Sequence, residues 1–124
     1  MIKLLSAALF LVLSITALGQ DENKIAHTKG KTDIIQSKET GIYSFILPDS
    51  ITSSDVERNN KYYTNYFKVE FNELTNEAII KLMKNDEKSK HLICHFLFAS
   101  GVEKVIHEGK KMSVEEFFQT YIKK

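Results

Sequence analysis

Hydrophobic and polar residues follow strand-like and helix-like periods along most of the chain. Residues 42–48 are apolar on both faces except at Ser44, which is typical of a buried central strand. Residues 67–74 alternate between apolar and polar side chains, and residues 78–83 are apolar again, so these two segments predict a β-hairpin. Residues 102–107 predict one further short strand.

Three helices are predicted around these strands. Ser54 and Ser113 each precede a glutamate by three residues, and this capping-box spacing indicates that a helix begins near each serine. Residues 86–100 have helical spacing, and Gly101 predicts the end of that helix because glycine readily adopts the left-handed conformation of a C-cap. The expected order is strand, helix, strand, strand, helix, strand, helix.

This order predicts an α+β domain, a ferredoxin-like βαββαβ sandwich with an additional C-terminal helix. The strands at 42–48 and 78–83 are the most apolar, as expected for the two central strands of that fold. Its helices normally cover one face of the sheet, whereas residues 42–48 offer apolar side chains to both faces. We expect the last helix to cover the second face, and a homodimer contact or another protein partner is the alternative.

The first forty residues differ in composition from the rest. Residues 1–19 combine a basic start, a short apolar run and the small residues Ala17 and Gly19, which predicts a cleaved signal peptide. The apolar run is too short to predict a stable membrane anchor. Residues 20–40 are polar and have little pattern, so we expect a flexible leader and a folded domain at 41–124.

The charge balance excludes one large class of partner. The chain has 17 basic and 16 acidic residues, and removal of Lys3 with the signal peptide leaves 16 of each. A neutral chain has no overall field that attracts nucleic acid, so we predict no nucleic-acid partner. The single cysteine allows no internal disulfide. With the signal peptide, these features predict an exported bacterial protein, either periplasmic or secreted.

The segment HLICHFLF, residues 91–98, carries the most specific candidate chemistry. His91, Cys94 and His95 lie within about one helical turn, so they could share a zinc or copper ion and leave one position open. We expect instead two outward-facing histidines and a half-buried thiol, because no fourth ligand lies nearby in sequence. An intermolecular disulfide is a further alternative for Cys94.

Three aromatic residues are candidates for an interaction surface. Phe98 lies near the histidines on a helical wheel, far from the apolar arc. We expect the last helix to pack across it, and a partner-binding patch with His91 and His95 is the alternative. Tyr62 and Tyr66 form a separate aromatic stripe, for which we expect packing between helices rather than stacking on a ligand.

Sequence motifs of catalysis are absent. The chain has no glycine-rich phosphate loop, no Gly-x-Ser-x-Gly elbow and no His-Glu-x-x-His motif. We therefore predict a non-enzymatic binding or interaction module. A periplasmic carrier of copper or zinc is the second hypothesis, and a small hydrolase or thiol enzyme is the third.

The order of elements over residues 42–107 resembles that of heavy-metal-associated domains. That family is ferredoxin-like and binds copper or zinc through a Cys-x-x-Cys pair in the loop after the first strand. The corresponding loop here is PDSITSSDVE, residues 48–57, which contains no cysteine. The resemblance therefore implies the fold, while none of the family's metal ligands has a counterpart in this chain.

Overall fold

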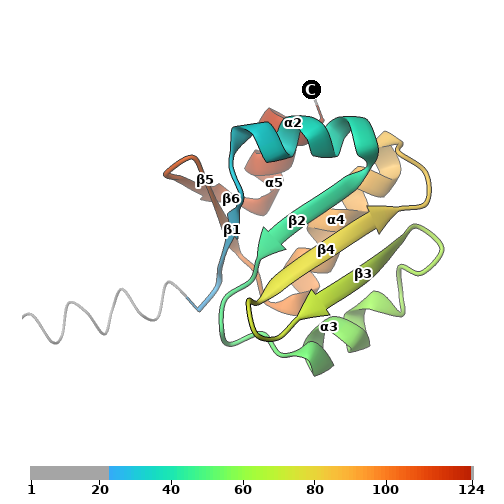
Figure 1. Cartoon of the computed structure of the whole chain (residues 1–124), viewed down its shortest axis with the longest axis vertical. Coiled ribbons are helices and arrows are strands. Elements are labelled where there is room, and N and C mark those ends of the chain that lie inside the picture. Colours follow the sequence, from blue (N-terminus) through green and yellow to red (C-terminus); the bar gives the residue numbers. More distant parts are fainter. Residues whose placement is uncertain (1–22, 124) are drawn as a thin grey trace, which may run out of the picture.

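One six-stranded sheet forms the centre of the computed structural model, which describes residues 23–123 (Figure 1). The strands are β1 (Ile25–Thr28), β2 (Ile42–Ile46), β3 (Phe67–Asn72), β4 (Glu77–Leu82), β5 (Lys104–His107) and β6 (Lys110–Ser113). Their order in the sheet is β3-β4-β2-β1-β5-β6. The sheet is mixed, because β1 and β5 are parallel whereas all other neighbours are antiparallel.

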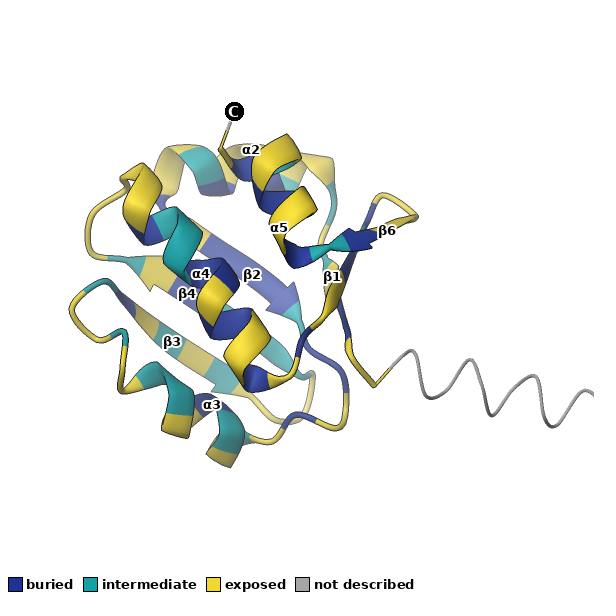
Figure 2. Ribbon diagram, turned by 180° about the vertical axis from the view of Figure 1, so that it is seen from behind, coloured by how far each residue is buried: buried dark blue, intermediate teal, exposed yellow. Residues whose placement is uncertain are grey.

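Helices cover one face and one end of this sheet. They are α2 (Lys31–Thr40), α3 (Ser53–Asn60), α4 (Glu87–Ser100) and α5 (Val114–Phe117), and α5 continues into the π-helix η1 (Phe118–Ile122). The helices α3, α4 and α5 lie on the same face (Figure 2). Helix α2 lies across one end of the sheet, where it contacts η1. The prediction of an α+β fold is confirmed.

The ferredoxin-like strand order is not confirmed. That order would place β5 beside β2, but β1 lies between them. Only Ile25 and Ala26 are buried in β1, so its four residues carry too short a pattern to predict a strand. Pairing with β2 on one side and β5 on the other satisfies its backbone groups.

Residues 25–40 are not the flexible leader that their polar composition predicts, because they form β1 and α2. Helix α2 ends at Gly41, whose φ of 76° is left-handed and whose N–H donates to the Ser37 carbonyl. The helix buries only Ile34 and Ser37, and this small apolar contribution explains why the sequence pattern did not reveal it. The predicted signal peptide, residues 1–19, lies outside the described residues.

Two of the three predicted helix boundaries are confirmed. Gly101 ends α4 in a left-handed conformation, and Ser113 caps α5 by accepting a backbone hydrogen bond. Helix α3 is different, because its N-cap is Thr52, two residues before Ser54, and the capping box is formed with Asp55. The chain also forms the unpredicted strand β6, whose sequence KKMS contains a single buried residue.

Aromatic side chains fill the space between the sheet and the helices. Phe45 of β2 meets Phe117 of α5 edge to face, with ring centroids 6.0 Å apart. Phe67 of β3 meets Phe96 of α4 in the same way at 5.8 Å. The last helix therefore packs on the face that α4 covers, and the prediction that it covers the second face is wrong. Burial of Phe117 in this core is the physical reason.

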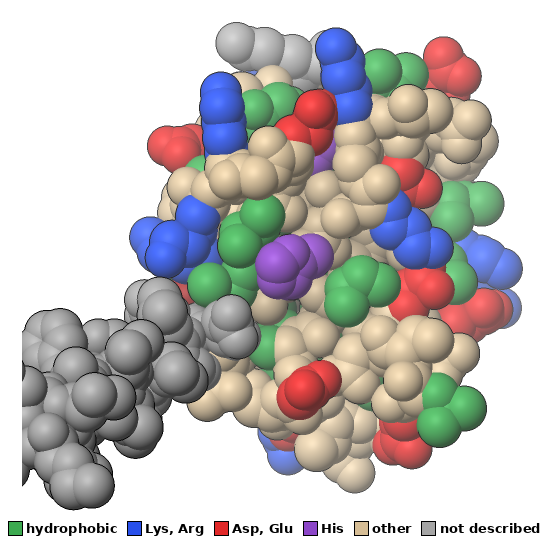
Figure 3. Space-filling model, turned by 60° about the vertical axis from the view of Figure 1, so that its left-hand side comes forward, with side chains coloured by type: hydrophobic (Ala, Val, Ile, Leu, Met, Phe, Trp, Pro, Cys, Tyr) green, Lys and Arg blue, Asp and Glu red, His purple; other side chains and the backbone are tan. Residues whose placement is uncertain are grey.

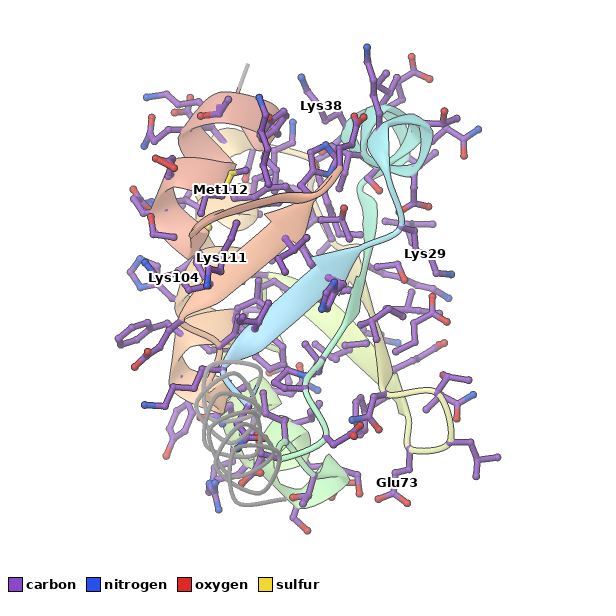
Figure 4. The ribbon with its side chains drawn as sticks, turned by 90° about the vertical axis from the view of Figure 1, so that its left-hand side faces the viewer. Lys29, Lys38, Glu73, Lys104, Lys111 and Met112 are labelled. Carbon is purple, nitrogen blue, oxygen red and sulfur yellow. The ribbon has the colours of Figure 1, made fainter. Side chains whose placement is uncertain are left out.

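The opposite face of β2, β4 and β3 has no helix across it in the described part of the chain (Figure 1). We call this side of the sheet the uncovered face. Isoleucines at its centre are partly or largely exposed, namely Ile42, Ile46, Ile79 and Ile106. Glu77 on this face accepts hydrogen bonds from Ser44 and Lys29. Lys29 projects from the side of the sheet away from α4 and α5 (Figure 4).

The surface around β1 mixes apolar and charged groups. His27 pairs in register with Ile46 on one side and Ile106 on the other, so the three side chains share the uncovered face. Figure 3 shows a histidine with hydrophobic side chains around it, and lysines and acidic side chains farther out. Because charged side chains lie among the apolar ones, the uncovered face can remain in contact with water.

Candidate functional site

Helix α4 places the predicted chemical residues at its junction with α5. Its buried residues include Ile93, Phe96 and Leu97. Cys94, expected to be half-buried, is only 6% exposed, whereas Ala99 is exposed. The burial of Cys94 follows from α5, which packs against this side of α4.

His91 interacts with the C-terminal helix. Its Nε2 donates to the Glu115 carboxylate at 2.9 Å, and its ring stacks on Phe118 with centroids 4.6 Å apart. This hydrogen bond is the main cause of the lowered pKa of Glu115. The exposed ring of His95 lies edge-on to His91, with centroids 5.2 Å apart. The two histidines therefore face outward and toward a neighbouring helix, as the sequence indicated.

Cys94 is held in the interior as a thiol. Its Sγ lies 3.9 Å from the Val114 carbonyl oxygen. Burial, assisted by the negative charge of Glu115, raises the pKa of Cys94 to about 12. A metal ligand or a nucleophile has to be a thiolate, so Cys94 would first have to lose a strongly held proton. An intermolecular disulfide would likewise require it to leave its buried position.

The metal hypothesis gains no support from the geometry. Within residues 23–123, no three histidine, cysteine or acidic side chains are arranged so that they could hold one ion. His91 is bonded to Glu115, and Cys94 points toward the backbone of α5. Zinc or copper binding by His91, Cys94 and His95 stays a prediction that would require these side chains to rearrange.

A concave surface opens beside these residues. A pocket of about 330 Å³ lies between α4, the start of α5 and the turn after α3. We call it the α4–α5 groove, and its lining residues are Tyr63, Cys94, His95, Phe98, Ala99, Val114 and Glu115. Most of this lining is apolar, and the carboxylate of Glu115 supplies its negative charge. Such a combination suits an apolar group with a polar neighbour.

Phe98 borders the α4–α5 groove and is 68% exposed. The expectation that the last helix packs across Phe98 is therefore wrong. Helix α5 contacts α4 at earlier turns than Phe98, where Val114 meets Cys94 and Phe118 meets His91. Because Phe98 is exposed beside an apolar pocket, the partner-binding alternative stays open for it.

The predicted tyrosine stripe does not lie on a helix, because α3 ends at Asn60. Tyr62 is 70% exposed, with the Lys61 ammonium 5.4 Å from its ring centre. Tyr66 is half-buried, and the Lys88 ammonium lies 5.5 Å from its ring centre. Neither tyrosine lines the α4–α5 groove, and the exposed Tyr62 does not show the expected packing between helices. The candidates from the sequence that do line the groove are Cys94, His95 and Phe98.

Four other groove residues were not predicted as parts of a site, namely Tyr63, Ala99, Val114 and Glu115. Tyr63 also packs against Phe67, with ring centroids 5.4 Å apart. Val114 and Glu115 belong to the start of α5. Their approach to Phe98 depends on how α4 and α5 pack, and no local sequence signal encodes that packing.

No helix among residues 23–123 is long and apolar enough to cross a lipid bilayer.

The comparisons with known proteins identify no relative of this chain. No protein-family model matches the chain, and no curated protein and no solved structure matches it, so the geometry of the α4–α5 groove is the main guide to function.

Proposed function

We propose that this protein is a non-enzymatic interaction module that holds an apolar side chain of a protein partner in the α4–α5 groove. The observation that carries the proposal is Phe98, which is 68% exposed at the border of an apolar pocket. Exposed aromatic residues beside apolar pockets are typical of the energetic centres of protein interfaces. Burial of Phe98 by a partner would remove a large apolar surface from water.

The charge at the groove indicates what the partner carries beside its apolar side chain. The Glu115 carboxylate is ionised at neutral pH, as glutamates ordinarily are, and the His91 hydrogen bond lowers its pKa further. Its side chain is about half exposed, so a partner can approach it. A lysine or arginine next to the apolar anchor would meet Glu115, which supports a partner segment of mixed apolar and basic character.

Two further features support a binding role over catalysis and a place outside the cytoplasm. The thiol of Cys94 is protonated and buried, so it is a poor nucleophile. The signal peptide predicted at residues 1–19 supports export to the periplasm or the medium. A homodimer contact on the uncovered face, and a relationship with heavy-metal-associated domains, both stay predictions.

Selection from a library of short random peptides tests the groove. The purified protein should enrich peptides that share an aromatic or branched aliphatic residue next to lysine or arginine. Phe98→Ala should weaken the binding of these peptides about tenfold or more, because it removes the exposed aromatic contact. Glu115→Gln should weaken selectively those peptides that carry the basic residue.

Leu74→Ala is the matched control, because Leu74 is 96% exposed on the turn between β3 and β4, away from the groove. This variant should bind the selected peptides as the native protein does. The proposal fails if the enriched peptides share no apolar anchor. It also fails if they bind Phe98→Ala as tightly as the native protein.

A further inference from the structure

A second pocket lies where the two parallel strands β1 and β5 end. It has a volume of about 290 Å³ and lies between α2, the β5–β6 turn and η1. We call it the α2–η1 pocket. Helix α2 contributes Lys31, Ile34, Ile35 and Lys38, which are spaced so that they share one face of the helix. None of the lining residues also lines the α4–α5 groove.

The walls of the α2–η1 pocket are apolar and aromatic. Ile34 is buried, whereas Ile35 is 50% exposed beside it. The π-helix η1 brings Tyr121 to the opposite wall, where its ring lies 4.5 Å from the ring of His107. Short π-helical segments are frequent at functional sites, because the extra residue redirects side chains. The pocket therefore offers a flat apolar surface to a ligand.

His107 supplies a buried polar group to this pocket. The residue is 1% exposed, and its Nδ1 lies 2.7 Å from Thr28 Oγ1. Thr28 Oγ1 also accepts a hydrogen bond from the N–H of Gly30. We assign the threonine hydroxyl as the donor to Nδ1, which leaves the ring proton on Nε2.

That Nε2 lacks a hydrogen-bond partner. The Glu108 carboxylate lies 3.7 Å from this nitrogen, which is beyond hydrogen-bond distance. A ring N–H without a hydrogen bond, on a residue that lines the pocket, can donate to a ligand oxygen. His107 therefore adds a hydrogen-bond donor to the two lysines.

Positive charge lies at the rim of the pocket. Among residues 23–123, the ammonium groups of Lys31 and Lys38 have neither an ion pair nor a hydrogen bond. Lys38, labelled in Figure 4, lies seven residues after Lys31, or about 10 Å along the helix axis. Glu108 is the carboxylate in the lining, so the pocket has a net positive charge and one group that repels anions.

We propose that the α2–η1 pocket binds a small molecule in which one carboxylate is joined to an apolar or aromatic body. The body lies against Ile34, Ile35 and Tyr121, and the carboxylate is held by the lysines and by Nε2–H of His107. Glu108 disfavours a second negative charge, so a monocarboxylate is preferred over phosphate or a dicarboxylate. This site is independent of the protein partner proposed for the α4–α5 groove.

Titration with phenylacetate, followed by NMR of the His107 ring, tests this proposal. Phenylacetate should shift the ring signals of His107 saturably, whereas 2-phenylethanol, which has the same ring but no charge, should bind at least about tenfold more weakly. The double variant Lys31→Gln/Lys38→Gln should lose affinity for phenylacetate by a similar factor. Lys110→Gln, an exposed lysine outside the pocket, should bind as the native protein does.

The variants are expected to fold, because the lysines make no side-chain interactions that folding would lose, and unchanged core amide signals verify this. The proposal is overturned if phenylacetate gives no saturable shift up to about 10 mM. It is also overturned if the double lysine variant binds with native affinity, or if inorganic phosphate displaces phenylacetate at lower concentration. Peptide binding in the α4–α5 groove is unaffected by either result.

Discussion

Burial controls the chemistry of the chain's only cysteine. Burial raises the pKa of Cys94 to about 12, so the thiolate fraction at pH 8 is about one in ten thousand. We expect iodoacetamide to modify native Cys94 at pH 8 about a thousandfold more slowly than the urea-unfolded chain, because only the thiolate reacts. Mass spectrometry of timed samples measures both rates. Equal rates would show that Cys94 is accessible and contradict its position between α4 and α5.

Glu77 links the stability of the uncovered face to pH. Its pKa is lowered, first by the hydrogen bond from Lys29 and then by that from Ser44. A carboxyl group with a lowered folded-state pKa stabilises the protein above its unfolded pKa, and this contribution is lost as the pH falls through the folded value. We expect Glu77→Gln to cost about 1 kcal/mol at pH 7 and progressively less as the pH falls below the ordinary pKa of a glutamate.

Urea unfolding of the native protein and Glu77→Gln at a series of pH values measures this dependence. Glu39→Gln is the control, because Glu39 is exposed on α2 and forms no side-chain interaction among the described residues. The control should differ little from the native protein at any pH. A pH-independent loss in Glu77→Gln would mean that packing, and not the charge of Glu77, stabilises this region.

At the scale of elements, Gly41 joins α2 to β2 without a loop. Its φ of 76° is left-handed, and an added Cβ would come no closer than 3.5 Å to Asn85, so the neighbouring atoms leave room for it. Gly41→Ala should therefore destabilise the protein by about 1 kcal/mol through backbone strain alone. Gly41→Asn should cost less, because asparagine tolerates this conformation. Thermal unfolding compares the two, and equal losses would contradict a backbone origin.

The sequence predicted the elements that have a clear period of apolar side chains. It did not predict the elements that are stabilised mainly by contacts with other elements. The strands β2, β3 and β4 have runs or alternations of apolar side chains over five or six residues. The helix α4 repeats its apolar side chains over more than one turn. In contrast, β1 and β6 have four residues each, and α2 buries one apolar side chain. Strand β1 pairs with β5 and α2 contacts η1, both distant in sequence, and a local pattern cannot report such contacts. Strand β6 pairs with its neighbour β5, but it has only a single buried side chain that could reveal it.

At the scale of the whole molecule, helices bury one face of the sheet, and the uncovered face is exposed to water. Ile80 is fully buried beneath the helices, whereas its neighbour Ile79 points to the uncovered face and is partly exposed. We expect Ile80→Ala to cost about 3 kcal/mol, because it leaves a cavity in the core. Ile79→Ala should cost about 1 kcal/mol or less, because water fills the space.

Denaturant unfolding at low protein concentration measures both losses. Because the two residues are identical and adjacent, differences in strand propensity cancel in this comparison. Equal losses would contradict a face open to water and would indicate that part of the chain or a second copy covers Ile79. A loss for Ile79→Ala that appears only at high protein concentration would favour the homodimer prediction.

The sequence by itself determined the α+β class, the strands β2, β3 and β4, the length and end of α4, and the outward position of His91 and His95. These features depend on the period of apolar side chains and on capping residues, both of which act over a few neighbouring positions. Only the tertiary structure decided that Phe98 stays exposed and that the last helix joins α4 on one face. It also brought Thr28 to His107 across 79 residues. Such contacts form between elements distant in the chain, and which faces meet is decided by how the whole core packs.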